Sequence, residues 1–190
     1  MLKTAKPASG HFHAVRFYES PEALGRIVAT FLGEGFAAGL PAIVIATPSH
    51  IAMVERELFA RGFDLDRLKS AGDLIIRDAE QALSTFMLDG MPDPRLFKSV
   101  MVPLIEQACR ERTDCVIRAY GEMVDVLWKK GLTVAATRLE MLWNELAQTH
   151  DFSLLCGYAM GSFYKDAAVE EICAVHTHVV SAHGEAAVTH

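Results

Sequence analysis

The sequence predicts an α/β fold, a three-layer α/β/α sandwich around a mainly parallel central sheet. Two observations support this prediction. Short apolar runs alternate along the chain with longer amphipathic segments, and one run, 42–46 (AIVIA), is apolar at every position. A strand that is apolar throughout is typical of a sheet covered on both faces. The amphipathic segments are long enough to cross the sheet as helices, which makes neighbouring strands parallel.

The first half of the chain predicts three strands and three helices. Ser20 and Thr47 are capping residues, and each is followed by a proline suited to the first helical turn. Gly39 and Gly62 stand where the first two helices are expected to end. Apolar runs place the strands at 13–18, 42–46 and 74–77, and apolar residues at helical spacing place the helices at 21–38, 49–60 and 79–87.

The second half begins with turn residues at 89–94 (DGMPDP). Gly131 separates two of the helices that follow. The last predicted helix depends on Ile172, Val175 and Val179, which are in phase. By the same criteria the sequence predicts helices at 95–110, 124–128, 132–148 and 167–179, and strands at 115–120 and 152–158.

The composition indicates one folded domain, because 190 residues is an ordinary domain length. A hydrophobic fraction of 51% with 22% charged residues excludes disorder. The net charge of -6 gives no basic footprint for nucleic acid. Without a signal peptide or an apolar run that could span a membrane, we expect a cytoplasmic protein whose four cysteines are reduced. We expect one domain over 11–180, with flexible ends at 1–10 and 181–190.

The carboxyl ends of the predicted strands are the expected ligand site, because open parallel sheets bind ligands there. Three carboxylates at this edge, Glu19, Asp78 and Glu122, could serve acid–base chemistry, bind a cation or pair with nearby arginines. We favour pairing with Arg16, Arg77 and Arg118, and orientation of a ligand. The candidate ligand-binding residues are His13, Tyr18, Glu19, Ser20, Thr47, His50, Asp78, Tyr120, Glu122 and Tyr158.

Phosphate chemistry has little support in the sequence. The helix N-termini after Ser20 and Thr47 favour anions, but ordinary capping explains each of them singly. The chain contains no GxxxxGK[ST] motif. Without its lysine and metal-binding hydroxyl, phosphoryl transfer loses its main charge stabilisation. We therefore expect no ATP or GTP hydrolysis, whereas nucleotide binding stays open.

Two histidine pairs could supply metal ligands. His11 and His13 share a face if they lie on a strand, whereas His176 and His178 point apart if they lie on a helix. His50 or Cys156 could complete a site, although Cys156 lies in an apolar run where a buried thiol is expected. Neither pair has the spacing of a zinc motif. The sequence therefore predicts no metal and no other cofactor.

Nine segments form an ordered series along the chain. They are HAVRFYE at 13–19, FLGEG at 31–35, AIVIATPSH at 42–50, DAE at 78–80, FMLDG at 86–90, AYGEMVD at 119–125, LW at 127–128, LEMLWN at 139–144 and FSLLC at 152–156 with Tyr158. Read together, these segments resemble the MEDS domain. This sensory domain is shared by a regulator of dichloromethane metabolism and many signalling proteins of methanogens and methylotrophs. The resemblance covers about residues 11–180, and the ordered series is more specific than any single motif.

The resemblance implies a RecA/KaiC-like fold of the P-loop NTPase type that lacks the phosphate loop, with 18–21 (YESP) in its place. It also implies a small ligand, suggested to be a hydrocarbon derivative, and no catalytic residue. Family members are usually joined to histidine kinase, ATPase or helix-turn-helix modules, and this sequence carries none. We therefore expect a separate signalling partner: a histidine kinase, an ATPase or a transcription regulator.

Three functions follow from these observations. The first is a non-catalytic sensory domain that binds a small molecule and signals to that partner, with no direct contact to nucleic acid or membrane and with a homodimer as one arrangement. The alternative is a degenerate nucleotide-binding scaffold that acts through protein–protein contacts. The third is a metal- or cofactor-dependent enzyme that uses the histidine and carboxylate groups.

Overall fold

A computed structural model describes residues 12–110, 112–160, 172–180 and 186–188 of the chain. The strands are β1 (Phe12–Tyr18), β2 (Ala42–Ala46), β3 (Leu74–Asp78), β4 (Met87–Leu88), β5 (Met91–Pro92), β6 (Ile117–Gly121), β7 (Phe152–Ala159), β8 (His178–Val180) and β9 (Ala186–Val188). The labelled helices are α1 (Pro21–Ala37), α2 (Pro48–Ala60), α3 (Leu65–Ser70), α4 (Ala79–Phe86), α5 (Pro94–Ala108), α6 (Met123–Lys129) and α7 (Thr133–Leu146).

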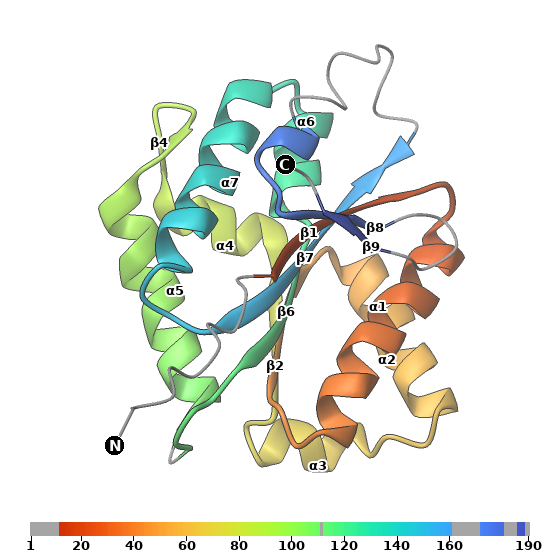
Figure 1. Cartoon of the computed structure of the whole chain (residues 1–190). Helices are drawn as coiled ribbons and strands as arrows, with labels where there is room; N and C mark the ends of the chain where they lie inside the picture. The colour runs from red at the N-terminus through yellow and green to blue at the C-terminus, as the bar shows by residue number, and fades with distance from the viewer. Residues whose placement is uncertain (1–11, 111, 161–171, 181–185, 189–190) are drawn as a thin grey trace, which may run out of the picture.

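The central sheet has the order β3-β2-β6-β7-β1-β8-β9 (Figure 1). The five strands from β3 to β1 are parallel, β8 is parallel to β1, and β9 is antiparallel to β8. Helices α1 and α2 lie on one side of the sheet, and α4, α5 and α7 lie on the other. The predicted α/β fold, a parallel sheet between helices, is confirmed.

Each face of the sheet has its own apolar core. Residues alternate along β1, so that Val15 packs toward α4–α7 and Ala14 packs toward α1 and α2. Strand β2 is buried at every position and contributes to both cores. This explains its unbroken apolar sequence, because a central strand of a three-layer fold has no face in contact with water.

The helix starts predicted at 21, 49, 79, 95, 124 and 132 are confirmed to within one residue, with one difference in how they are capped. Ser20 caps α1, since its Oγ accepts a hydrogen bond from the backbone N–H of Ala23 at 3.2 Å. Thr47 stands at the start of α2, but its side chain makes no capping hydrogen bond. Asp78 caps α4 by accepting from the N–H of Gln81 at 2.8 Å.

The C-terminal part differs from the prediction. The predicted helix 167–179 is wrong at its end, because Val175 to Thr177 lie outside any helix and His178–Val180 forms β8. Residues 167–171 lie outside the described residues. Ala186–Val188 pairs with β8 as β9, although the sequence predicts a loose end over 181–190. The short helix α3 and the hairpin of β4 and β5 were also not predicted.

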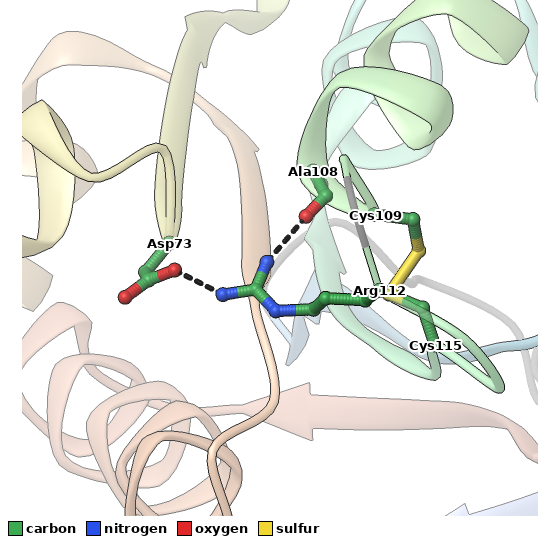
Figure 2. Close-up of a disulfide and its surroundings, with 5 residues drawn as sticks. All are labelled: Asp73, Ala108, Cys109, Arg112 and Cys115. Atoms are coloured by element: carbon green, nitrogen blue, oxygen red, sulfur yellow. Dashed lines mark hydrogen bonds and ion pairs between the residues drawn. A yellow bond between two sulfur atoms is a disulfide. The ribbon is translucent and has the colours of Figure 1, made fainter.

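The cysteines are not all reduced, which corrects the sequence-based expectation. Cys109 and Cys115 form a disulfide just beyond α5, with their Cα atoms 5.6 Å apart (Figure 2). Between them in sequence, Arg112 donates hydrogen bonds to the carbonyl oxygen of Ala108, at 2.7 Å, and to the carboxylate of Asp73. The disulfide therefore closes a loop that an ion pair joins to the residue just before β3.

Among the described residues, no helix has the length and apolar character needed to cross a membrane.

Candidate functional site

Glu122, directly after β6, organises a buried polar cluster at the carboxyl ends of the strands. Its carboxylate accepts hydrogen bonds from Nδ1 of His50 at 2.6 Å and from the hydroxyl of Tyr120 at 3.0 Å. It also accepts from the backbone N–H of Thr47. The carboxylate therefore joins the end of β6 to the start of α2, as the predicted convergence of strand ends requires. The predicted pairing of Glu122 with Arg118 is wrong, because the Arg118 guanidinium lies over the ring of Phe31 instead.

A second carboxylate, Asp125 on α6, extends this cluster. It accepts hydrogen bonds from the hydroxyl of Tyr18 at 3.2 Å and from the N–H of Ala159 at 3.1 Å. Lys129 lies 2.7 Å away and balances its charge. The ring of Tyr18 meets that of His50 edge-on, with centroids 5.9 Å apart, so the two carboxylate groups form one continuous polar cluster.

Burial and hydrogen bonding set the charge states of this cluster. Burial raises the pKa of Glu122, but the hydrogen bonds from His50 and Thr47 outweigh it and bring the pKa below its usual value. Burial, with the nearby carboxylates, raises the pKa of Tyr18 and Tyr120. At neutral pH the cluster therefore holds an ionised glutamate and two neutral phenols.

The side chains of the remaining predicted residues at this edge make no described contact with the cluster, and Thr47 joins it only through its backbone N–H. Glu19 is exposed, Ser20 is occupied by capping, and the Thr47 hydroxyl lies 3.4 Å from Ser49. Asp78 is half-buried at the end of β3. Glu19 and Asp78 thus do not form a carboxylate cluster with Glu122, and the sequence-based idea of three converging carboxylates is wrong in that form.

Asp78 lies instead in a cleft of about 290 Å³ where β3 meets α4 and α5. A volume of this size suits a small organic molecule. The side that β3 and α4 form is mostly polar, whereas the side from α5 is apolar except for Gln107. The lining residues are Arg77, Asp78, Gln81, Ala82, Thr85, Val100, Pro103, Leu104 and Gln107.

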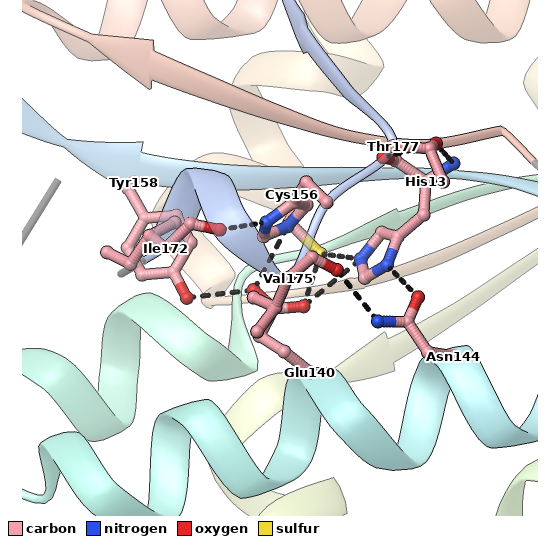
Figure 3. A network of polar contacts seen from close by, with 9 residues as sticks. His13, Glu140, Asn144, Cys156, Tyr158, Ile172, Val175 and Thr177 are labelled. Atoms are coloured by element: carbon pink, nitrogen blue, oxygen red, sulfur yellow. Dashed lines mark hydrogen bonds and ion pairs between the residues drawn. The ribbon is translucent and has the colours of Figure 1, made fainter. Parts of the chain in front are cut away.

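A second buried polar cluster lies on the opposite face, under α7. Figure 3 shows His13, Cys156 and Tyr158 directed from their strands toward Glu140 on α7. One oxygen of Glu140 accepts from the Tyr158 hydroxyl at 2.8 Å, and the other lies 3.1 Å from Nε2 of His13. His176 approaches the same carboxylate at 3.2 Å. Predicted residues His13 and Tyr158 therefore belong to this cluster and not to the one around Glu122.

The charges of this second cluster depend on Glu140. Burial raises its pKa, but the two histidines outweigh burial and lower it. Burial lowers the pKa of His176, and Glu140 outweighs this effect and raises it. Burial and the same carboxylate raise the pKa of Cys156 and Tyr158, which keeps both protonated in this environment.

Sequence reasoning missed Asp125 and Glu140. A usable signal exists for Glu140, since it follows Ala136 by four residues and precedes Trp143 by three, and both of these are buried. A carboxylate on the apolar stripe of a helix must be buried, and a buried carboxylate needs partners. Asp125 lies in a helix of seven residues that is too short to show a stripe.

These features define an α/β domain of the class whose ligands bind at the carboxyl ends of parallel strands. A match to a protein-family model identifies the family within this class. Residues 12–177 match MEDS, the methanogen/methylotroph, DcmR sensory domain. The chain belongs to this family, which implies a role in sensing a signal. No curated protein matches the chain.

Proposed function

We propose that this chain is a non-catalytic sensory domain that binds a small molecule and passes the signal to a separate protein. The ligand occupies the cleft at the carboxyl end of β3. The observation that supports this proposal most directly is the position of the cleft, because it opens at the sheet edge where ligands of such folds bind. Membership of a sensory family supports the same role.

The lining of the cleft indicates the chemistry of the ligand. Val100, Pro103 and Leu104 offer an apolar wall from α5, which suits a hydrocarbon part. Arg77 and Asp78 offer a cation and a carboxylate at the strand end, which suit one polar group. A short hydrocarbon derivative with a single polar group fits both walls, in agreement with the ligand class that the family resemblance implies.

Helix α4 connects this cleft with the buried cluster around Glu122 and Asp125. Ala82 and Thr85 of α4 line the cleft, and Glu80 of the same helix lies 2.8 Å from Lys130, which follows α6. Helix α6 carries Asp125, the partner of Tyr18. A ligand that prefers one position of α4 would thereby shift the population of α6 positions, as a two-state sensor requires.

The charge states support a role without catalysis. General acid–base groups work best when their pKa lies near the working pH. The pKa of Glu122 is lowered and those of Tyr18 and Tyr120 are raised, so all three move away from neutrality. These groups are suited to holding structure and orienting neighbours.

The RecA/KaiC-like ancestry that the resemblance implies also belongs to this proposal, and the parallel sheet between helices is compatible with it. A nucleotide ligand receives less support. Only Glu19 and Ser20 separate β1 from α1, and Pro21 at the helix start has no N–H to offer a phosphate. A phosphate loop needs several free N–H groups at that position.

A thermal-shift screen with small hydrocarbon derivatives and nucleotides tests the proposal. A ligand at one hundred times its Kd adds about 2.7 kcal/mol, which raises Tm by about 5–10 °C for a chain of this size. The variant Gln107→Trp fills the cleft and should abolish the shift. Ser99→Trp is the matched control, because Ser99 is an exposed polar residue of the same helix that does not line the cleft.

Three results would contradict the proposal. They are a screen in which no compound raises Tm, a shift that survives Gln107→Trp, and a shift produced by nucleotides alone. The last result would favour the nucleotide-binding scaffold.

A further inference from the structure

Four buried side chains with metal-ligating atoms meet on the face of the sheet that α7 covers. They are His13 on β1, Cys156 on β7, Glu140 on α7 and His176 just before β8. None of the four residues exposes more than 3% of its surface. One ligand atom from each lies within 4.8 Å of those of the other three. Segments far apart in sequence therefore direct four donor atoms at one point.

The hydrogen bonds of the two imidazoles fix which nitrogen faces that point. Nδ1 of His176 lies 2.7 Å from the carbonyl oxygen of Ile172, which can only accept, so Nδ1 carries the proton. Asn144 donates its Nδ2 to the carbonyl oxygen of Val175 at 2.7 Å. Its Oδ1 therefore faces Nδ1 of His13, at 2.8 Å, and accepts from it. Both Nε2 atoms are left facing the cluster, as in metal-binding histidines.

The donor atoms are spaced nearly as around a tetrahedral ion, with two of the four distances below slightly shorter than zinc would give. Nε2 of His13 lies 3.1 Å from Oε2 of Glu140 and 3.3 Å from Sγ of Cys156, and these last two atoms are 3.5 Å apart. Nε2 of His176 lies 3.2 Å from the other carboxylate oxygen. Zinc bonds of about 2.0–2.3 Å in tetrahedral geometry give ligand–ligand distances of about 3.3–3.6 Å.

The charges also balance. A thiolate and a carboxylate carry two negative charges, and two neutral imidazoles carry none. One divalent cation therefore makes the buried site neutral, which removes the cost of burying unpaired charge. The Tyr158 hydroxyl, 2.8 Å from Glu140, holds the carboxylate as the outer partners of metal ligands do.

We propose that His13, Glu140, Cys156 and His176 form a structural zinc site. Nitrogen, sulfur and oxygen donors together suit zinc, and four protein ligands are typical of structural sites. The bound ion attaches the segment that carries His176 to β1, β7 and α7. This inference is independent of the ligand proposed for the cleft, which lies at the end of β3.

The competing arrangement is an ion pair between Glu140 and a protonated His176, without metal. Both arrangements use the same atoms, but they differ in metal content and in the state of Cys156. A zinc ligand is a thiolate, whereas the ion pair leaves a thiol.

The first experiment measures metal in the full chain, purified without chelators and without a histidine tag. Mass spectrometry of the elements should find about one zinc per chain, before or after incubation with Zn²⁺ and removal of excess metal. Exchange with Co²⁺ should give the visible bands of a tetrahedral ion and a thiolate-to-cobalt band in the near ultraviolet. Less than about a tenth of an ion per chain after incubation would overturn the proposal.

Variants assign the ligands. Cys156→Ser should abolish the thiolate-to-cobalt band, and Asn144→Ala, which removes the support of His13, should weaken zinc binding about 10–100-fold. Cys173→Ala is the control for the other cysteine outside the disulfide, and Cys109→Ser with Cys115→Ser controls for the disulfide pair. These controls should keep the band. Retention of the band in Cys156→Ser would overturn the proposal, and if that variant does not fold, the wild-type metal content and the Asn144→Ala affinity decide.

Discussion

Nδ1 of His50, at the start of α2, lies 2.6 Å from Oε2 of Glu122, at the end of β6. The same carboxylate oxygen lies 3.0 Å from the hydroxyl of Tyr120, and the second oxygen meets the N–H of Thr47. Three donors from two elements thus converge on one carboxylate that is only 1% exposed. Loss of its charge should affect stability more than loss of any exposed carboxylate.

Glu122→Gln should lower the free energy of unfolding by about 2–3 kcal/mol, because hydrogen bonds to a charged group are replaced by weaker ones. Urea denaturation followed by circular dichroism measures this change. Glu19→Gln is the control, since Glu19 is exposed, and it should change stability by less than about 0.5 kcal/mol. Equal effects of the two variants would mean that the Glu122 contacts contribute nothing.

The same carboxylate should make stability depend on pH. The pKa of Glu122 is lowered in the folded state, so its contribution is full above the unfolded value of about 4.3 and is lost as pH falls through the folded pKa. The groups that face it are His50, Tyr120, Tyr18 and Asp125. Unfolding free energies of wild type and Glu122→Gln, measured from pH 7 to pH 3, should converge below about pH 4. A constant difference over this range contradicts the prediction.

A close approach between Gly157 on β7 and Tyr120 on β6 gives a third prediction. A Cβ at Gly157 would lie 2.9 Å from the buried hydroxyl of Tyr120 and 3.4 Å from Leu24. Gly157→Ala should therefore destabilise the chain by about 1–3 kcal/mol. Gly121→Ala is the matched control, because its Cβ would meet only Leu154, at 4.0 Å. Chemical denaturation of both variants should show a loss for Gly157→Ala alone.

The disulfide gives a fourth prediction. Cys109 and Cys115 are six residues apart, and closing so short a loop contributes about 2 kcal/mol. Reduction should lower the free energy of unfolding by up to this amount and weaken the pairing of Arg112 with Asp73. Alkylation of the unfolded chain should label two cysteines without reductant and four with it. Four labelled cysteines without reductant would show that the bond does not form.

The fold was largely predictable because its elements are signalled locally. The apolar run of β2 predicts a strand, and the capping sequence before α1 predicts a helix start, each from only a few neighbouring residues. The end of the chain was not predictable in this way. Ile172, Val175 and Val179 are in helical phase, but the N–H of Thr177 donates instead to the carbonyl oxygen of His13 at 2.8 Å. A pairing across 164 residues cannot be read from local periodicity.

The candidate site was predictable in part for a related reason. Strand ends meet at one edge, so the proximity of His50, Tyr120 and Glu122 followed from the expected topology. The sequence predicts His13 and Tyr158 at the same edge, but both point to the α7 face because residues alternate along a strand, and His13 stands at the amino end of β1. The role of Glu140 could not be predicted, because it depends on how α7 packs on the sheet. The disulfide could not be predicted either, because the spacing of Cys109 and Cys115 matches no known motif.

The position of β1 also has a consequence for synthesis on the ribosome. Strand β1 is made first, but both of its neighbours, β7 and β8, come after residue 150. The nascent β1 must therefore wait, with both edges unpaired, until most of the domain has left the exit tunnel. Strands β2 and β3 can pair much earlier. An unpaired apolar strand is prone to aggregation, so translation of this domain should benefit from a chaperone that shields its first segment.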